Sequence, residues 1–312
     1  MSCATSFAVD LWTHLHLSFR YAIFKNLFAQ GFFGQVFLTL QGAHEKQHGT
    51  INTEQVTLLK LYDSYLHLGV DEHQPESTDI ASREGQVLLQ SFFLLAKAAE
   101  TIMLGDKDEP WEGARAELVG AHQGLVLMMR AMLAFILPTQ ATRTRSNGPG
   151  PEPDPVEENR ALLDIGSGLV TALRSTDAQA VEQLVSLLKT TAKFSPAVSP
   201  FQPTSASAAL PPEGHAMTQT GRAAPMNAEA GDSSGGGGKG LEFMKREVLR
   251  LITALVYVPA NPGDMSAEER EAVKQVQDRV RESGGLFEVL NMTVLDTENP
   301  CEFQSFVIVS LI

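Results

Sequence analysis

Apolar side chains recur at every third or fourth position along most of the chain, which is the period of an α-helix with one buried face. In the opening residues the spacing is four, through Phe7, Leu11, Leu15, Phe19, Ile23 and Leu27. The same pattern predicts helices over residues 55–68, 79–104 and 111–137, the last of them ending at Pro138. No window alternates apolar and polar residues between regularly spaced turns, so no sheet is expected. The predicted fold class is all-α.

Two segments have the composition of linkers and divide the chain into three predicted units. Residues 138–155 end in a stretch with proline at alternate positions, which prevents helix and strand alike. Residues 195–240 consist mainly of Ser, Ala, Pro and Gly, so we expect this long insert to be disordered. The units are an N-terminal region of helical repeats over 1–137, a helical hairpin over 156–194 and a C-terminal unit over 241–312.

The C-terminal unit shows the most regular pattern. It begins with one apolar stripe, which consists of Met244, Val248, Leu251, Leu255 and Val258. After a proline-rich break, Ser266 and Glu269 have the spacing of a capping box that begins a second helix. A glycine pair and a short, mostly apolar helix follow. Because this order is typical of an armadillo repeat of about 40–47 residues, we predict an armadillo- or HEAT-like α-solenoid of stacked helical hairpins.

Three short stretches of this unit follow one another in a recognisable order. They are Phe243-Met244-Lys245-Arg246-Glu247-Val248-Leu249-Arg250-Leu251-Ile252, Val280-Arg281-Glu282-Ser283-Gly284-Gly285-Leu286-Phe287-Glu288-Val289-Leu290 and Asp296-Thr297-Glu298-Asn299-Pro300. In this order and spacing they resemble the C-terminal homology domain of the ataxin-10 family. The resemblance implies a non-catalytic scaffold that binds other proteins in the cytoplasm, with regulation of cytokinesis as the implied process.

The resemblance ends after Asn299-Pro300. Members of the family continue with an Arg-Glu pair and a further helix, whereas this chain ends in a stretch rich in β-branched and aromatic residues. We therefore expect residues 301–312 to be a truncated or mis-spliced terminus that leaves the armadillo repeat incomplete. Transcript sequencing across the Pro300 codon tests this expectation, and abundant message in this reading frame contradicts it.

Composition and charge narrow the classes of partner. The formal net charge is −13, and an acidic chain is repelled by phosphate backbones and anionic lipid, so neither nucleic acid nor a membrane is an expected partner. The uninterrupted apolar runs, such as residues 92–96 and 131–138, are shorter than the roughly 20 residues of a membrane span. The two cysteines, Cys3 and Cys301, lie near opposite ends, which suits a reducing cytoplasm. The expected partners are other proteins.

One motif carries candidate metal chemistry. The stretch His44-Glu45-Lys46-Gln47-His48 matches the pattern in which two histidines one helical turn apart bind zinc and the glutamate acts on a bound water. Flanking glycines shorten any helix here, the middle positions are polar, and no third ligand lies on an adjacent predicted helix. We interpret the stretch as a solvated loop and predict no metal, no cofactor and no enzymatic activity. A zinc metallopeptidase acting through His44, Glu45 and His48 is the alternative function.

Candidate binding residues follow from the repeat pattern. In armadillo arrays the last helix of each repeat lines the concave face. Glu288 and Asn291 are the polar positions on the predicted short helix, and Lys245 and Arg250 flank the apolar stripe nearby. We take these four residues as candidates for partner binding. Three methionines, Met128, Met129 and Met132, lie among leucines and are expected to pack in the core rather than to bind a soft metal.

Overall fold

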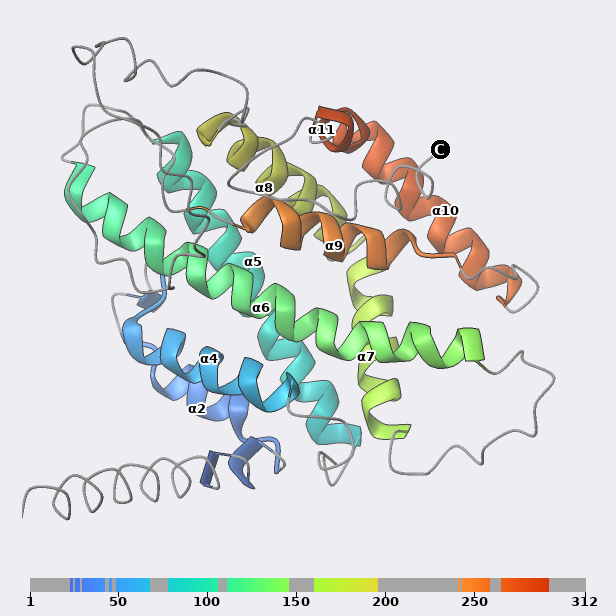
Figure 1. The fold of residues 1–312 in the computed structure, drawn as a ribbon, viewed down its shortest axis with the longest axis horizontal. Coiled ribbons are helices and arrows are strands. Elements are labelled where there is room, and N and C mark those ends of the chain that lie inside the picture. The colour runs from blue at the N-terminus through green and yellow to red at the C-terminus, as the bar shows by residue number, and fades with distance from the viewer. Residues whose placement is uncertain are drawn as a thin grey trace, which may run out of the picture.

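The computed structural model describes residues 23–24, 26–28, 30–42, 45–46, 49–67, 78–105, 111–145, 160–195, 241, 243–258 and 265–291. Within these residues the chain is mostly helical and contains no strand, which confirms the predicted all-α class. The helices labelled in Figure 1 are α2 Phe33–Thr39, α4 Thr53–His67, α5 Thr78–Leu104, α6 Trp111–Arg145, α7 Arg160–Arg174, α8 Ala180–Phe194, α9 Met244–Val256, α10 Ala267–Glu282 and α11 Gly285–Asn291.

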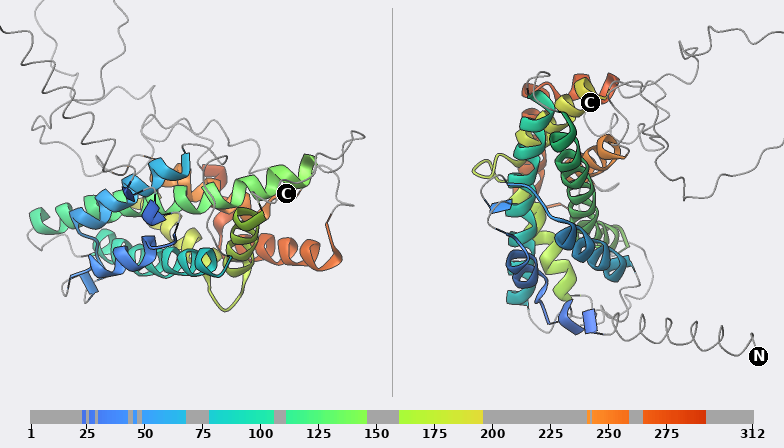
Figure 2. Two further views of the ribbon diagram at one scale, coloured as in Figure 1. Left: turned by 90° about the horizontal axis from the view of Figure 1, so that it is seen from below. Right: turned by 90° about the vertical axis from the view of Figure 1, so that its left-hand side faces the viewer.

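The helices lie in two layers, seen edge-on in Figure 2. In one layer α4, α6 and α9 lie side by side, and α6, in the middle, contacts both of the others (Figure 1). In the second layer α5 contacts α2 and α8. The layers are joined because α5 packs on α6 and α8 packs on α9, while α7 packs against α5 and α6. α10 and α11 cover α8 at one end of the molecule.

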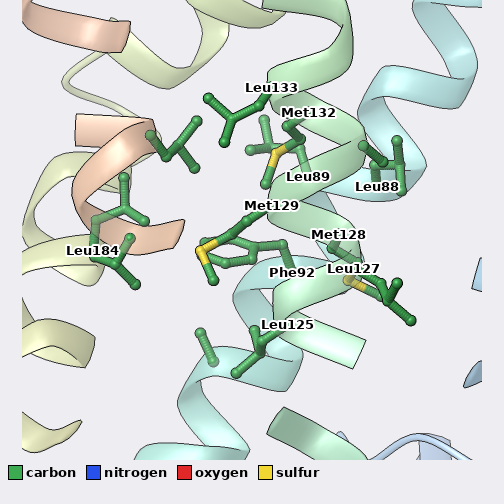
Figure 3. Close-up of a cluster of buried hydrophobic side chains, with 14 of the residues drawn as sticks. Leu88, Leu89, Phe92, Leu125, Leu127, Met128, Met129, Met132, Leu133 and Leu184 are labelled. Carbon is green, nitrogen blue, oxygen red and sulfur yellow. The ribbon is translucent and has the colours of Figure 1, made fainter. Parts of the chain in front are cut away.

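The hydrophobic core lies between the two layers and is formed mainly by α5, α6, α8 and α9. Its centre contains Leu88, Leu89, Phe92, Leu125, Leu127, Met128, Met129, Met132, Leu133 and Leu184 (Figure 3). The three methionines are at most 1% exposed, so their predicted place in the core is confirmed. Unbranched thioether side chains fill irregular gaps where helices cross, which accounts for their position here.

Two helical stretches of the described chain, Glu84–Leu104 and Ala116–Gln140, are long and apolar enough to cross a membrane by length and composition alone. Neither stretch is an uninterrupted apolar run in the sequence, because polar residues are spread through both helices. The same composition is found in the central helices of a core. α5 and α6 pack against each other and against helices on either side, and the buried share of the apolar window is 39% in the first stretch and 61% in the second.

A buried polar contact joins α2, α4 and α5. Glu84 of α5 accepts a hydrogen bond from the backbone N–H of Phe33 at 3.0 Å and one from the hydroxyl of Tyr62 at 3.1 Å. The rings of Phe33 and Tyr62 are stacked, with their centroids 4.0 Å apart. Burial raises the pKa of Glu84 to about 7, although both hydrogen bonds act in the opposite direction. The contact fixes α2 and α4 to α5. Because Glu84 titrates near neutral pH, the stability of the folded protein depends on pH.

Residues at the start of α10 form the predicted capping box. Ser266 Oγ accepts a hydrogen bond from the N–H of Glu269, and the Glu269 carboxylate accepts one from the N–H of Ser266, both at 3.1 Å. α10 ends at Glu282, and Gly284 follows with a φ of 74°, a conformation that glycine adopts without strain. Most of the predicted apolar stripe of α9 is buried. Val258 is the exception, because it follows the end of the helix and is 41% exposed.

The substitution Ser266→Ala tests this cap. It removes the acceptor for the Glu269 N–H, and we expect the free energy of unfolding to fall by about 1 kcal/mol in chemical denaturation. Ser186→Ala, at an exposed position of α8, is the matched control and is expected to change stability by less than about 0.5 kcal/mol. Equal losses in the two variants would contradict a specific role for the cap.

The predicted end of the third helix at Pro138 is wrong. α6 continues through Pro138 to Arg145, so residues 138–145 belong to the helix and not to the predicted linker over 138–155. A proline removes one backbone donor, and packing of this turn offsets the loss. Thr139 is buried where α6 meets Gly166 of α7, and Gln140 donates a hydrogen bond to the carbonyl of Ala254 in α9 at 2.7 Å. Tertiary contacts therefore override the local signal.

The three predicted units share one core. α7, from the predicted hairpin over 156–194, contacts α5 and α6, and α9, from the unit over 241–312, contacts α6. Several predictions lie outside the described residues. They concern the helix over residues 7–22, the end of the linker at 146–155, the insert at 196–240, the zinc motif histidines His44 and His48, and the terminus over 292–312.

Candidate functional site

A cluster of charged residues lies on the layer formed by α4, α6 and α9. Arg130 of α6 pairs with Asp63 of α4, with Nη2 and Oδ2 3.0 Å apart. The Asp63 side chain is mostly buried, while 37% of the Arg130 side chain is exposed. Burial raises the pKa of Asp63 above its ordinary value, and this effect exceeds the lowering by Arg130 and His67. The charge of Glu247 on α9 also raises this pKa, so side chains of α4 and α9 interact across α6.

Glu247 is fully buried and is held by two arginines of its own helix. Its Oε1 accepts hydrogen bonds from Arg246 Nη2 at 2.7 Å and from Arg246 Nε at 3.1 Å. Its Oε2 accepts one from Arg250 Nη1 at 2.9 Å. A buried carboxylate without partners is strongly destabilising, so both guanidinium groups are held in place by Glu247. About one-third of each arginine side chain is nevertheless exposed.

We refer to Arg130, Arg246 and Arg250 as the arginine face. An aromatic side chain extends it at the start of α9, where the ring of Phe243 lies 4.5 Å from Arg246 Cζ in a cation–π contact. Phe243 is 37% exposed and has a φ of 67°. A left-handed conformation costs a bulky residue roughly 1–2 kcal/mol, and such strained residues cluster at functional sites.

The other end of α9 is held by side chains from two neighbouring helices. Gln140 of α6 donates to the carbonyl of Ala254 at 2.7 Å, and Arg174 of α7 donates to that of Leu255 at 2.9 Å. The last carbonyls of a helix have no partner within it, so these bonds satisfy groups that would otherwise need water. They fix the direction of α9 beside α6 and hence the position of the arginine face.

Arg279 of α10 forms hydrogen bonds with the end of α7 and the start of α8. Arg279 donates through Nε to Glu182 at 2.7 Å and through Nη1 to the carbonyl of Arg174 at 2.8 Å. The hydrogen bond from Arg279 lowers the pKa of Glu182 below its ordinary value. The pair contributes stability that is present above the ordinary pKa of a glutamate and is lost as the pH falls through the lowered value.

A cavity of about 450 Å³ lies where α10 begins, next to the ends of α6, α7 and α9. Its lining combines hydroxyl, amide and charged side chains with a few apolar ones, and includes Tyr257 just after α9. The lining residues are Thr139, Gln140, Ser167, Val170, Thr171, Arg174, Ser175, Thr176, Tyr257, Met265, Glu268, Glu269, Ala272 and Gln275. The cavity and Phe243 therefore lie at opposite ends of α9, with the arginines between them.

The four predicted binding residues do not form one site. Arg250 belongs to the arginine face, whereas Lys245 is only 3% exposed and is therefore not an open contact residue. The helical period explains the difference, since position 245 lies on the broad side of α9 that neighbouring helices cover. Glu288 is half-buried and Asn291 is exposed, and both lie on α11 at the far end of the second layer.

The zinc motif is described only at Glu45 and Lys46. Its two histidines lie outside the described residues, so the structure gives no geometry for a metal there. Among the residues whose side chains are described, no group of three or more His, Cys, Asp or Glu side chains is placed to hold a metal ion.

Three residues of this site, Asp63, Arg130 and Phe243, are not among the binding residues predicted from the sequence. Arg130 is a single charged residue inside a long apolar stretch of α6, and Asp63 interrupts the apolar pattern of α4 in the same way. Such charges are rarely buried without a partner, so each was a usable signal that a charged neighbour from another helix lies close. The strained backbone of Phe243 had no sequence signal.

Comparison of the chain with protein-family models, with curated proteins and with solved structures found no match in any of the three.

Proposed function

We propose that the protein is a non-catalytic scaffold of the ataxin-10 type, which binds other proteins in the cytoplasm through the arginine face. The observation that carries the proposal is the arrangement of Arg130, Arg246 and Arg250. These three partly exposed arginine side chains are held by two buried carboxylates: Asp63 of α4 pairs with Arg130 of α6, and Glu247 of α9 pairs with the two arginines of its own helix. Regulation of cytokinesis is the process that the sequence resemblance suggests, and we include it in the proposal.

The order of the helices supports a scaffold built from stacked pairs. α5 packs on α6 and α8 packs on α9, and the two pairs lie next to each other because α5 contacts α8 and α6 contacts α9. α4 extends the row on the other side of α6. In arrays of this kind each pair buries its open face on its neighbour, and one layer becomes a continuous surface for partners.

The composition of the face also supports binding. Arginine, tyrosine and tryptophan are enriched among the residues that carry most of the energy at protein interfaces. The exposed side of α9 offers Arg246 and Arg250 between Phe243 and Tyr257. The arginines are already ordered by Glu247, so a partner loses less side-chain entropy when it binds them.

Site-specific photo-crosslinking in cells tests the proposal. A photoreactive phenylalanine analogue is placed at Phe243 or at Tyr257, where it replaces an aromatic side chain of similar size. We expect both positions to give discrete adducts with other proteins. The matched control places the analogue at Leu94, which is 58% exposed on α5 in the opposite layer. Adducts that are the same from all three positions, or none from α9, would contradict the proposed surface.

A further inference from the structure

We propose that the arginine face recognises an extended acidic segment of a partner protein, with glutamate or aspartate at alternate positions and an aromatic or apolar residue at its ends. This inference rests on the proposed scaffold function and names the chemistry of its partner. It follows from the free donors, the charge balance and the spacing of the residues on α9.

The guanidinium groups keep donors for a ligand. In the described residues Arg246 Nη1, Arg250 Nε and Nη2, and Arg130 Nε and Nη1 make no hydrogen bond. Arginine has a planar fork of donors that matches a carboxylate, and charge-assisted bonds of this kind are about twice as strong as neutral ones. Each arginine can thus hold its buried carboxylate and a second one from solvent.

The local charge favours an anion. The cluster contains three arginines and two carboxylates, Asp63 and Glu247, so its formal charge is positive although the net charge of the chain is −13. The two carboxylates are buried beneath the arginines, whose exposed parts form the surface that a partner meets. A positive patch on an acidic protein attracts acidic segments locally, and the net charge disfavours long polyanions.

The spacing fits an extended peptide. Arg246 and Arg250 are one helical turn apart, which is about 6 Å along the helix axis. Alternate side chains of an extended chain are about 6.6–6.8 Å apart on one side, so acidic residues two apart can reach both arginines. From Phe243 to Tyr257 the axis rises by about 21 Å, the length of roughly six extended residues.

Nucleic acid fits these observations less well. Its affinity comes from many phosphate contacts with lysine and arginine, whereas this cluster offers three arginines, two of them on one helix turn. The aromatic residues at the two ends of α9 are too far apart to stack on adjacent bases. The test therefore includes an oligonucleotide as a competing probe.

Fluorescence anisotropy on the full chain measures the binding. The probe is a fluorescein-labelled peptide of sequence Phe-Glu-Thr-Glu-Thr-Glu-Thr-Tyr, and the matched probe has glutamine in place of each glutamate. At low ionic strength we expect the glutamate peptide to bind at least about tenfold more tightly than the glutamine peptide, with the difference shrinking as salt is added. Equal affinity of the two peptides overturns the inference without any variant of the protein.

A triple variant that removes two arginines together with the carboxylate that pairs with them locates the binding. Arg246→Gln, Glu247→Gln and Arg250→Gln are combined, so that no buried carboxylate is left unpaired. We expect this variant to bind the glutamate peptide at least about tenfold more weakly. Lys97→Gln, on the exposed side of α5, changes the net charge by the same −1 and is expected to leave the affinity unchanged. If the triple variant does not fold, the pair Asp63→Asn and Arg130→Gln, which keeps the net charge, takes its place.

The outcomes separate this inference from the proposed function. Photo-adducts from α9 without preference for the glutamate peptide mean that the face binds proteins of another chemistry, and the inference is wrong. A labelled oligothymidine of eight nucleotides that binds as tightly as the glutamate peptide also overturns it, because the face then reads negative charge alone. Tight peptide binding that survives in the triple variant places the site elsewhere and overturns it as well.

Discussion

Replacing Gly166 with alanine is expected to lower the free energy of unfolding by about 3 kcal/mol. Gly166 lies where α7 crosses α6, and a Cβ atom at this position would be 2.2 Å from the carbonyl oxygen of Phe135 and 2.2 Å from Thr139 Oγ1. One of these atoms belongs to the backbone of α6 and cannot turn away. The two helices must therefore separate, which opens the core between the layers, and urea denaturation measures the loss.

Gly168, two residues further along α7, is the matched control. A Cβ atom there meets no other atom within 4 Å. Alanine is the better helix former, so Gly168→Ala is expected to raise the free energy of unfolding by about 0.5–1 kcal/mol. If both substitutions stabilise the protein, the close crossing of α6 and α7 is wrong.

Replacing Glu84 with glutamine is expected to stabilise the protein by about 3 kcal/mol at pH 8 and to have almost no effect at pH 4. Glutamine has the same shape, and its oxygen can still accept from the Phe33 N–H while its amide donates to the Tyr62 hydroxyl. The wild-type carboxyl has a pKa of about 7 in the folded protein and an ordinary value of 4.5. Glutamine does not titrate, so the variant avoids the free-energy cost of burying an ionised carboxylate at this position.

The direction in which the stability of the wild-type protein changes with pH follows from the number of protons that the folded and unfolded states bind. Between pH 4.5 and pH 7 the unfolded chain has released the Glu84 proton while the folded protein retains it. The folded state then binds more protons, so wild-type stability attributable to this group falls as the pH rises and levels off above pH 7. Chemical denaturation of both proteins at a series of pH values measures the difference. A difference that stays constant from pH 4 to pH 8 would contradict the raised pKa.

Local signals in the sequence predict the helices well because they depend on short stretches of chain. Ser266 and Glu269 specify a helix start through their own side chains, and the structure has the same hydrogen bonds. Pro138 gave the wrong helix end because other helices hold this turn in place: Thr139 is buried, and Gln140 donates a hydrogen bond to the carbonyl of Ala254 in α9. A rule that depends only on neighbouring residues cannot predict a contact with a helix that lies far away in the sequence.

The candidate site is less predictable for the same reason. Arg250 flanks an apolar stripe and is recognisable from the sequence, but its neighbour Lys245 is buried by the packing of α9. The pair of Asp63 with Arg130 joins α4 to α6, and the sequence marks each residue only as a charge in an apolar helix. Which charges meet depends on the order of the helices in the layer, and that order is a property of the whole fold.

The central claim is that α4, α6 and α9 lie in a row, with α6 in the middle. Double electron–electron resonance between spin labels at Ser64 on α4, Ala134 on α6 and Thr253 on α9 measures the three separations directly. The structure predicts that the α4–α9 separation is the longest, because α6 contacts both of its neighbours and lies between them. An α4–α9 separation shorter than either of the others would contradict the row and, with it, the shared arginine face.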